Sequence, residues 1–330
     1  MPKLGKVGVV TVTYNSEKVI DAFLDCVLRQ DQVDFVLYVI DNFSSDATLR
    51  QVGHYQDPRI VVIANQNNVG VAAANNQGIV AALKANCEYV LLINNDTEFD
   101  VDLISKLCQG HEQYQCGMIA PKIMYYDKPD IIWYAGGDFS PLRGYSSPHW
   151  GMGCKDTSQF DVPCQIGYAP TCCMLIHREV FRHVGLMDAR YFVYFDDTDF
   201  CFRARQCGER LFYLPSVRIF HKVSSLTGGA ESPAQVLYMT RNHVYYLAKN
   251  LGWVHCLYCL PLYQLKIAWK LLTGRLSPSS FCVSQVGFWK GVRMSFPRAR
   301  HTGSSPASGG ERQLHVSPNP SLGIADAKLP

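Results

Sequence analysis

Three aspartates stand within an aromatic segment, FVYFDDTDF, at residues 192–200. They are Asp196, Asp197 and Asp199. Burial among aromatic rings raises the pKa of a carboxylate, because it disfavours the charged form, and a neighbouring carboxylate raises it further. A carboxylate with a raised pKa is a stronger base, and it can take the proton of a hydroxyl that attacks an electrophilic carbon. The segment therefore contains a candidate general base.

The same aspartates also fit the N-terminus of a helix with the sequence TDFCFRARQCG. Acidic side chains at this end of a helix are stabilised by its dipole. We expect both interpretations to hold, with Asp199 mainly structural. Asp199 can also pair with Arg203 one helical turn later.

A further carboxylate follows a buried run of apolar residues in LLINNDTEFD, residues 91–100. Asp96 in this position can hold Mg²⁺ or Mn²⁺, which are hard cations that prefer oxygen ligands and bridge phosphates. Asn94 is a weaker ligand two positions earlier. The sequence therefore predicts a divalent cation at this strand end.

Alternating elements position these groups. β-branched or apolar runs predict strands, and apolar residues at helical spacing predict helices between them. The expected strands are 7–13, 35–40, 60–64 and 89–93, and later 131–135 and 173–176; the expected helices are 19–28 and 78–85. Strands that alternate with helices favour an α/β fold with a mostly parallel sheet.

Ligands of such sheets bind beyond the carboxyl ends of the strands. The expected strands end in four polar clusters, which are Thr13-Tyr14-Asn15, Asp41-Asn42, Asn65–Asn68 and Asn94–Asp96. Asp41 could accept the imide N–H of uracil or thymine. The alternative for each cluster is ordinary turn chemistry, since Asn and Asp favour turns.

Small residues dominate NVGVAAANNQG at residues 68–78, where Asn75 and Asn76 could line a ligand site. Small side chains let the backbone approach a ligand closely, or they let a helix pack tightly on the sheet; both can be true. The sequence contains neither G-x-G-x-x-G nor G-x-x-x-x-G-K-[ST], which weakens nucleotide-binding hypotheses based on those loops.

The C-terminal part is basic and apolar. Residues 232–310 contain no Asp or Glu and nine bases, which leaves 3 − 9 = −6 for the rest of the chain. The bases are Arg241, Lys249, Lys266, Lys270, Arg275, Lys290, Arg293, Arg298 and Arg300.

Residues 251–272 are apolar but interrupted by Pro261 and charges, which suits an amphipathic helix in a membrane interface better than a spanning helix. In that arrangement Trp253, Tyr258, Tyr263 and Trp269 lie at headgroup depth. The alternative is a helix packed on the catalytic unit. Nucleic acid is not an expected partner, because no recognition motif accompanies the bases.

Thirteen cysteines in an irregular pattern, with no signal-peptide-like N-terminus, predict reduced thiols in the cytoplasm. Cys256 and Cys259 form a C-x-x-C without a second pair, so no zinc site is expected.

Eight segments in order resemble inverting family 2 glycosyltransferases of the GT-A fold, in the rhamnosyltransferase-like branch, over roughly residues 5–225. They are TVTYN, IDNFSSD, NVGVAAANNQG, LLINNDT, IIWYAGG, GYAPTCCMLIHREVFRHVGLMD, YFVYFDDTDFCFRARQCG and YLPSVRIFHKVSSLTGG. The resemblance implies a Rossmann-like sheet with helices on both faces. It also implies a nucleoside-diphosphate sugar as donor, a glycan or lipid-linked saccharide as acceptor, and Mg²⁺ or Mn²⁺ as cofactor.

The resemblance assigns roles to individual residues. Asp197 is the base and Asp196 its neighbour. Asn94 and Asp96 occupy the D-x-D metal motif, whose first acid is replaced here by Asn94, and His221 matches a histidine that joins the metal or diphosphate site. Trp150, Tyr194 and Arg203 fall near the sugars or the diphosphate. The nucleotide-binding set is Thr13, Tyr14, Asn15, Asp41, Asn68, Asn76 and Asn95.

The expected organisation has three parts: a catalytic domain at 1–230, with a nucleotide-binding half (1–99) and an acceptor half (100–230); a basic apolar helical, membrane-proximal region at 231–296; and a disordered tail at 297–330. The expected activity is metal-assisted transfer from dTDP-rhamnose or a UDP-sugar, in a cytoplasmic protein peripheral to the inner face of the membrane. Two alternatives stay open: a sugar nucleotidyltransferase, although TVTYNSEK lacks a Gly-rich phosphate loop, and a catalytically weak nucleotide-sugar-binding protein.

Overall fold

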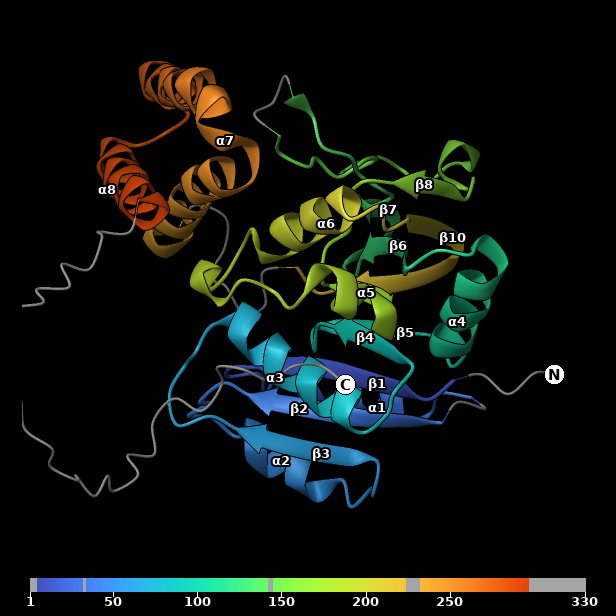
Figure 1. The fold of residues 1–330 in the computed structure, drawn as a ribbon. Coiled ribbons are helices and arrows are strands. Elements are labelled where there is room, and N and C mark those ends of the chain that lie inside the picture. The colour runs from blue at the N-terminus through green and yellow to red at the C-terminus, as the bar shows by residue number, and fades with distance from the viewer. Residues whose placement is uncertain (1–4, 32–33, 142–144, 224–231, 297–330) are drawn as a thin grey trace, which may run out of the picture. The chain divides into compact units, whose positions relative to one another are not determined.

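Four parallel strands alternate with three helices in the N-terminal part of the computed structural model (Figure 1). The strands are β1 (Val7–Thr13), β2 (Phe35–Asp41), β3 (Ile60–Ala64) and β4 (Tyr89–Ile93); the helices are α1 (Ile20–Leu28), α2 (Thr48–His54) and α3 (Val71–Lys84). β1 pairs in parallel with β2 and β4, and β2 pairs in parallel with β3. The carboxyl ends of these strands therefore meet at one edge, as the sequence predicts.

The structure describes residues 5–31, 34–141, 145–223 and 232–296. The expected disordered tail at 297–330 and the side chain of Trp253 lie outside what it describes. The described residues up to Ser295 belong to one compact unit.

The residues from β5 to β10 extend this sheet with strands of both directions. The further elements are β5 (Thr97–Phe99), α4 (Leu103–Tyr114), β6 (Met118–Tyr125), β7 (Lys128–Tyr134), η2 (Ser158–Phe160), β8 (Cys164–Ile166), β9 (Cys173–His177), α5 (Arg178–Val184), η3 (Ala189–Tyr191), α6 (Asp196–Gln206) and β10 (Leu211–His221). Among the described residues the sheet runs in the order β3-β2-β1-β4-β9-β6-β10-β5, with β7 beside β6 and β8 beside β10. β9 runs antiparallel to β4 and β6, so the sheet is mixed in this half.

Helix α3 packs tightly on the sheet and begins at Val71, earlier than the expected start at residue 78. Ala72, Ala74 and Ala82 are fully buried. Gly70 has φ of 85°, and a Cβ there would lie 2.6 Å from the backbone oxygen of Phe192. Glycine is required at this position because of both its positive φ and the close approach. The tight-packing interpretation of residues 68–78 is thus confirmed.

A hairpin of two helices, α7 (Pro233–Leu272) and α8 (Pro278–Ser295), follows the sheet. Its helices approach closely, since a Cβ on Gly291 would lie 2.4 Å from the Arg241 oxygen. Within α7, Gly252 has φ of 75° and ψ of 169°, which interrupts the helix and divides it into two halves. In the part of the chain that the structure describes, no helix combines the length and apolarity needed to cross a bilayer.

Candidate active site

Asp41 lies at the carboxyl end of β2 with both carboxylate oxygens engaged. Its Oδ1 accepts a hydrogen bond from Thr13 Oγ1 at 2.9 Å, and its Oδ2 accepts one from the Ser44 backbone N–H at 3.0 Å. Register pairs Thr13 with Asp41 directly across β1 and β2. The structure therefore brings Thr13 and Asp41 together, as expected for a base-reading corner.

Exposed groups surround that corner. Asn15 has φ of 51°, and its Oδ1 accepts a hydrogen bond from the Ser45 backbone N–H at 2.9 Å. The rings of Tyr14 and Phe43 are 45% and 56% exposed. Flat exposed rings of this kind can stack on a nucleobase. Of these two rings, the sequence patterns single out only Tyr14.

Three other predicted nucleotide contacts have side chains that stabilise the fold. Asn68 Oδ1 accepts hydrogen bonds from Asn42 Nδ2 and the Gly70 backbone N–H. The Asn76 amide exchanges two hydrogen bonds with the Met187 backbone, at 2.8 and 3.0 Å. Asn95 is buried and donates to Val12 O and Ser16 Oγ. These three amides stabilise the loops at the carboxyl ends of the strands. Most of their hydrogen-bonding groups are already engaged by other residues of the fold.

Asp96 and His221 form the pair at which the sequence predicts a cation. His221 Nε2 lies 3.2 Å from Asp96 Oδ1, and both side chains are at most 9% exposed. Strands β5 and β10 create this pair, because His221 is in register with Thr97 and Lys222 N–H donates to Asp96 O. Burial acts to lower the pKa of His221, but Cys172 and Asp96 raise it to about 10.

The donor set of this pair fits a divalent cation. One carboxylate oxygen and one neutral imidazole nitrogen are both ligands of such ions, so a bound cation would displace the proton that Asp96 and Cys172 favour on His221. Two adjacent ligands of an octahedral ion at about 2.1 Å are about 3 Å apart, which is close to the observed separation. Among the described residues no group of three His, Cys, Asp or Glu side chains is arranged so that it could hold a metal ion by itself. Further ligands would have to come from phosphate oxygens, water or the Asn94 side chain. The backbone N–H of Asn94 donates to Cys172 O, which fixes this residue beside the pair.

Asp196 and Asp197 open helix α6. Burial raises the pKa of Asp197, and hydrogen bonds from Thr198 and Tyr168 oppose the rise. Asp197 Oδ2 accepts from Tyr168 Oη at 3.1 Å, and its Oδ1 accepts from the Thr198 backbone N–H at 2.6 Å. Burial and then the charge of Asp197 also raise the pKa of Asp196. The predicted raised pKa of Asp197 is confirmed in direction.

A two-residue segment, Thr171–Cys172, links the carboxylate pair to the Asp96–His221 pair. The Thr171 backbone acts to lower the pKa of Asp197, and the Cys172 side chain raises the pKa of His221, so each residue lies close to one of the two groups. Cys172 O also accepts from the Asn94 backbone N–H at 3.0 Å. The candidate base and the candidate cation ligands therefore flank the same short segment, which runs into β9.

The backbone ahead of α6 is strained. Phe192, Tyr194 and Phe195 have φ of 66°, 64° and 68°, a conformation that non-glycine residues rarely adopt. Asn242 of α7 holds it in place: its Nδ2 lies 2.9, 2.7 and 2.8 Å from the carbonyl oxygens of Tyr191, Val193 and Tyr194. Asn242 is fully buried. The C-terminal hairpin thus positions the helix that carries Asp197.

Asp199 has the structural role that the sequence predicts. It is fully buried and accepts hydrogen bonds from Tyr191, Arg203, Lys249 and Asn250. The i to i+4 ion pair with Arg203 is confirmed at 2.8 Å. Lys249 also bonds Asp188, so one lysine of α7 joins two carboxylates of the catalytic unit.

Arg203, which is predicted to lie near the sugars or the diphosphate, is engaged within the fold. Its Nε binds Asp199 Oδ2, and its two terminal nitrogens donate to Val184 O at 2.6 Å and Leu186 O at 2.9 Å. Every guanidinium nitrogen thus has a partner within the fold. Arg203 instead fixes the loop after α5 against α6.

Trp150 lies in a loop that is anchored to the sheet. Its backbone exchanges hydrogen bonds with Gly136 O and Ala135 N, and its ring covers Gly136 while staying 39% exposed. The following segment is fixed by Lys122 of β6, whose fully buried ammonium binds Asp156 and Asp161 at 2.7 and 2.6 Å. Tyr194, the other ring expected at a sugar, lies in the strained segment and is half-buried.

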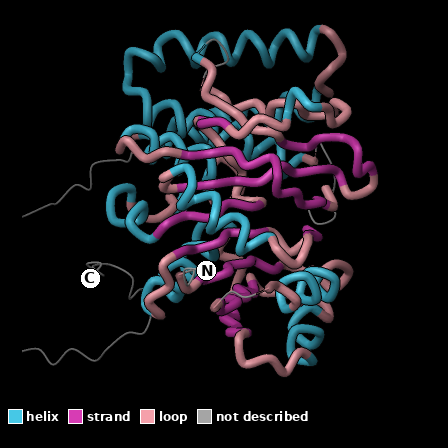
Figure 2. The backbone as a smooth tube through the Cα atoms, turned by 90° about the vertical axis from the view of Figure 1, so that its right-hand side faces the viewer, coloured by secondary structure: helices cyan, strands magenta, loops and turns pink. Residues whose placement is uncertain are grey.

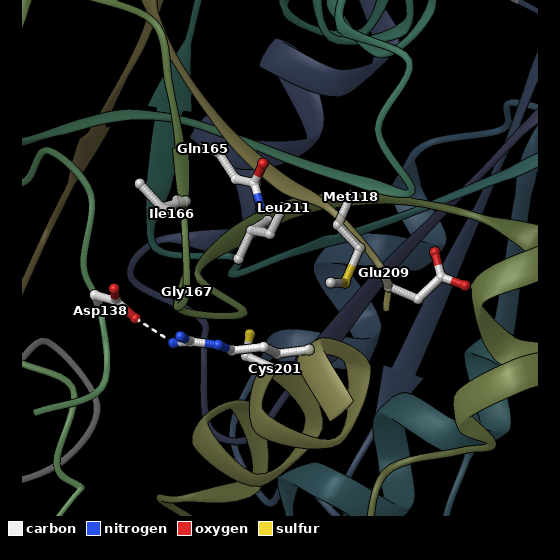
Figure 3. Close-up of a pocket in the computed structure, with 9 residues that line it drawn as sticks. Met118, Asp138, Gln165, Ile166, Gly167, Cys201, Glu209 and Leu211 are labelled. Carbon is white, nitrogen blue, oxygen red and sulfur yellow. Dashed lines mark hydrogen bonds and ion pairs between the residues drawn. The ribbon is translucent and has the colours of Figure 1, made fainter. Parts of the chain in front are cut away.

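A pocket beside the later turns of α6 is lined by other groups (Figure 3). It is lined by Met118, Asp138, Gln165, Ile166, Gly167, Cys201, Arg205, Glu209 and Leu211. Arg205 and Asp138 form an ion pair at 2.8 Å across it, drawn as a dashed line in Figure 3. Burial raises the pKa of Cys201 to about 12, which favours the protonated thiol at neutral pH. The pocket contains none of the predicted site residues.

The chain belongs to glycosyl transferase family 2, since the family signature matches residues 8–185. It is similar to the low-salt glycan biosynthesis hexosyltransferase Agl10 of Haloferax volcanii, with 27% identity over 75% of this chain and 76% of the relative. It is also similar to the N-acetylglucosaminyl-diphospho-decaprenol L-rhamnosyltransferase of Mycobacterium tuberculosis, with 23% identity over 74% of this chain and 85% of the relative. The expected family and the rhamnosyltransferase-like branch are confirmed, and the chain is a glycosyltransferase.

Solved structures support the GT-A fold. GalNAc-T7 with UDP, GalNAc and Mn²⁺ has a TM-score of 0.58 at 17% identity, over 75% of this chain and 48% of that one. The mannosyltransferase PcManGT from Pyrobaculum calidifontis, in complex with GDP-Man and Mn²⁺, has a TM-score of 0.55 at 16% identity, over 87% of both chains. The expected fold class is therefore confirmed.

Proposed function

We propose that this glycosyltransferase moves a sugar, with inversion, from a nucleoside-diphosphate sugar to a hydroxyl of a glycan or lipid-linked saccharide. The observation that supports this proposal is the Thr171–Cys172 segment, which lies close to the raised-pKa carboxylate Asp197 at one residue and to His221 of the Asp96–His221 pair at the next. A proton acceptor beside a diphosphate-binding pair is what a direct displacement at the anomeric carbon needs.

The proposal assigns the nucleobase and the diphosphate of the donor to different residues. Asp41 and Thr13 meet the base, and the exposed Tyr14 and Phe43 rings offer stacking surfaces. Asp96 and His221 would hold Mg²⁺ or Mn²⁺, which supplies positive charge that makes the nucleoside diphosphate a better leaving group. Mn²⁺ in the two related structures supports this choice of ion.

Asp197 takes the proton of the acceptor hydroxyl as the oxygen forms its bond to the anomeric carbon. The bond from that carbon to the diphosphate oxygen breaks in the same step, so the proton ends on Asp197 and the negative charge on the released nucleoside diphosphate. Attack opposite to the leaving group inverts the anomeric centre. Tyr168 and Thr198 hold the Asp197 carboxylate in position.

The donor and acceptor classes come from the relatives. The named activities of the mycobacterial relative and of the dTDP-rhamnosyl transferase RfbF of Shigella flexneri support dTDP-rhamnose as a donor to test. The decaprenol-linked substrate in the name of the mycobacterial relative supports a lipid-linked acceptor. UDP- and GDP-sugars complete the donor panel, because related structures hold UDP and GDP-Man.

A donor panel tests the proposal. We expect one nucleotide sugar, with Mn²⁺ present, to raise the melting temperature and to release nucleoside diphosphate when a saccharide acceptor is added. Asp197→Asn should keep the thermal shift and lose the release. Release of pyrophosphate would instead establish a nucleotidyltransferase, and binding without any release by the unmodified chain would establish a binding protein.

A further inference from the structure

The second half of α7 presents an apolar face to solvent. Seven apolar side chains on it are between 44% and 81% exposed: Val254, Leu257, Tyr258, Leu262, Leu265, Trp269 and Leu272. With about 100° between successive residues, they fall within an arc of about 140°. We call these seven residues the α7 stripe. A continuous exposed apolar face of this kind marks an interaction surface rather than a random scatter of apolar residues.

Cations accompany the α7 stripe, and acids do not. Lys266 and Lys270 lie along one flank of the arc, and Arg275, Lys290 and Arg293 are exposed on the rest of the hairpin. No Asp or Glu occurs anywhere from residue 232 to residue 310. The stripe therefore suits a partner that is apolar where it touches the arc and negatively charged around it.

The stripe lies on the outside of the hairpin. Figure 1 places α7 and α8 together at the upper left, apart from the strands, and Figure 2 shows a long helix running along the upper edge. The first half of α7 packs against the catalytic unit and α8. After Gly252 the helix turns, and its outer face has no covering element among the described residues.

We propose that the α7 stripe docks this enzyme on an anionic lipid surface, with the helix lying in the headgroup region. Burial of the apolar arc at the acyl boundary and attraction of the lysines to anionic headgroups act together in this arrangement. A second copy of this chain fits less well. Two hairpins face to face would bring positive flanks together without an acid on either to neutralise them.

The docking surface lies next to the candidate catalytic helix. His255 at the start of the second half contacts Tyr145, and Tyr145 contacts Phe202 of α6. Phe195, directly before Asp196, stacks on His243 of α7 at 5.2 Å. If the proposed function holds, an acceptor anchored in lipid would reach Asp197 from the surface on which the enzyme rests. The lipid contact itself does not depend on the reaction.

Flotation of the full chain with vesicles tests the proposal. We use phosphatidylcholine vesicles with and without phosphatidylglycerol and measure the bound fraction in the absence of any donor. The unmodified chain should bind the anionic vesicles. Leu265→Gln with Trp269→Gln should lower the partition coefficient at least about tenfold, because two apolar side chains no longer enter the interface. Lys266→Gln with Lys270→Gln should lower it about tenfold on anionic vesicles only.

Matched substitutions elsewhere separate docking from general effects. Val101 and Val162 are 52% and 64% exposed on the catalytic unit, so Val101→Gln with Val162→Gln should leave vesicle binding within about twofold. Lys84→Gln with Lys128→Gln serves the same purpose for charge. All variants are compared by circular dichroism and by light scattering after size-exclusion chromatography.

Three results would overturn the proposal. The first is no binding of the unmodified chain to either vesicle, and the second is binding that the stripe variants retain. The third is a dimer that the Leu265→Gln and Trp269→Gln variant converts to a monomer while vesicle binding stays absent, which would assign the stripe to a second copy. Transfer to a water-soluble acceptor is assayed in parallel, so that loss of docking and failure of the proposed reaction give different outcomes.

Discussion

His221 Nε2 lies 3.2 Å from Asp96 Oδ1, although the two residues are far apart along the chain: Asp96 directly precedes β5, and His221 is the last residue of β10. The antiparallel pairing of β5 with β10 brings them together. If they hold the cation, His221→Leu should weaken Mn²⁺-dependent nucleotide binding by about 10- to 100-fold and leave metal-free binding unchanged. Isothermal titration calorimetry of UDP and dTDP, with and without Mn²⁺, measures this.

Lys222→Gln is the control for that experiment, because Lys222 neighbours the pair but its side chain binds Glu98. It should retain the Mn²⁺ dependence. An equal Mn²⁺ dependence in His221→Leu and the unmodified chain would remove His221 from the site.

Replacement of Asp197 should separate binding from chemistry. Asp197→Asn keeps the shape of the carboxylate but cannot accept the acceptor proton, so kcat should fall by about 10²- to 10⁴-fold. The donor Kd should change by less than about twofold. Asp138→Asn is the matched control, since Asp138 lies in the separate pocket and pairs with Arg205. A kcat for Asp197→Asn within tenfold of the unmodified chain would exclude Asp197 as the base.

Tyr168 should set the acid limit of activity. Its hydroxyl donates to Asp197 and lowers the pKa of that carboxyl, while burial raises it. Tyr168→Phe removes the donor, so the pKa of Asp197 should rise further and protonation should silence the base at higher pH. The acid limb of the kcat/KM profile should therefore move upward by about one unit or less. Movement toward lower pH, or none, would contradict this account.

Asp196 should make the fold less stable as pH rises. Its pKa is raised by burial and by Asp197, so between about pH 4 and the raised value the folded chain binds more protons than the unfolded chain. Stability then falls with rising pH through that window. Asp196→Asn should be more stable than the unmodified chain at pH 8 by about 1 kcal/mol or more, with the gain vanishing near pH 4.

The stability of Asp196→Asn is measured by urea or thermal denaturation at a series of pH values. Asp188 provides a control in the same measurement, because its pKa shift has the opposite sign. Burial raises its pKa, but Arg190 and Lys249 lower it well below the ordinary range. Asp188→Asn should therefore lose stability at neutral pH, with the loss shrinking as the carboxyl is protonated in acid. A pH-independent difference for Asp196→Asn would show that its charge is not the cause.

Asn242 should act on catalysis through the backbone that it holds. Asn242→Leu conserves most of the volume but removes the amide that donates to Val193 O and Tyr194 O, while Tyr191 O keeps its bond from Arg241, at a cost of about 2–4 kcal/mol in unfolding free energy. Where the variant stays folded, kcat should fall while donor Kd is preserved, because Asp41 and Asp96 lie on other elements. Asn250→Leu, which removes one bond to Asp199, should lower stability with a smaller change in kcat.

The parallel half of the fold and the polar strand ends can be predicted from sequence, because alternating apolar runs and Asn or Asp at their ends are local patterns. Asp41, Asp96 and Asp197 stand out for the same reason. Two partners of Arg203, the carbonyls of Val184 and Leu186, could not be predicted, because they carry no sequence signature. Asn242 has no local signal either: its role depends on a segment that becomes strained only when α7 and α6 meet.

The backbone conformation of Gly252 sets the angle at which this enzyme would lie on the proposed lipid surface. Gly252, with φ of 75° and ψ of 169°, occupies a conformation that is almost closed to other residues, and no atom lies near its missing side chain. The first half of α7 is fixed to the catalytic unit, while the second half bears the stripe. Relatives that differ at this single position could therefore present the same reaction centre to their acceptor at another tilt or height, without any change among the reacting groups.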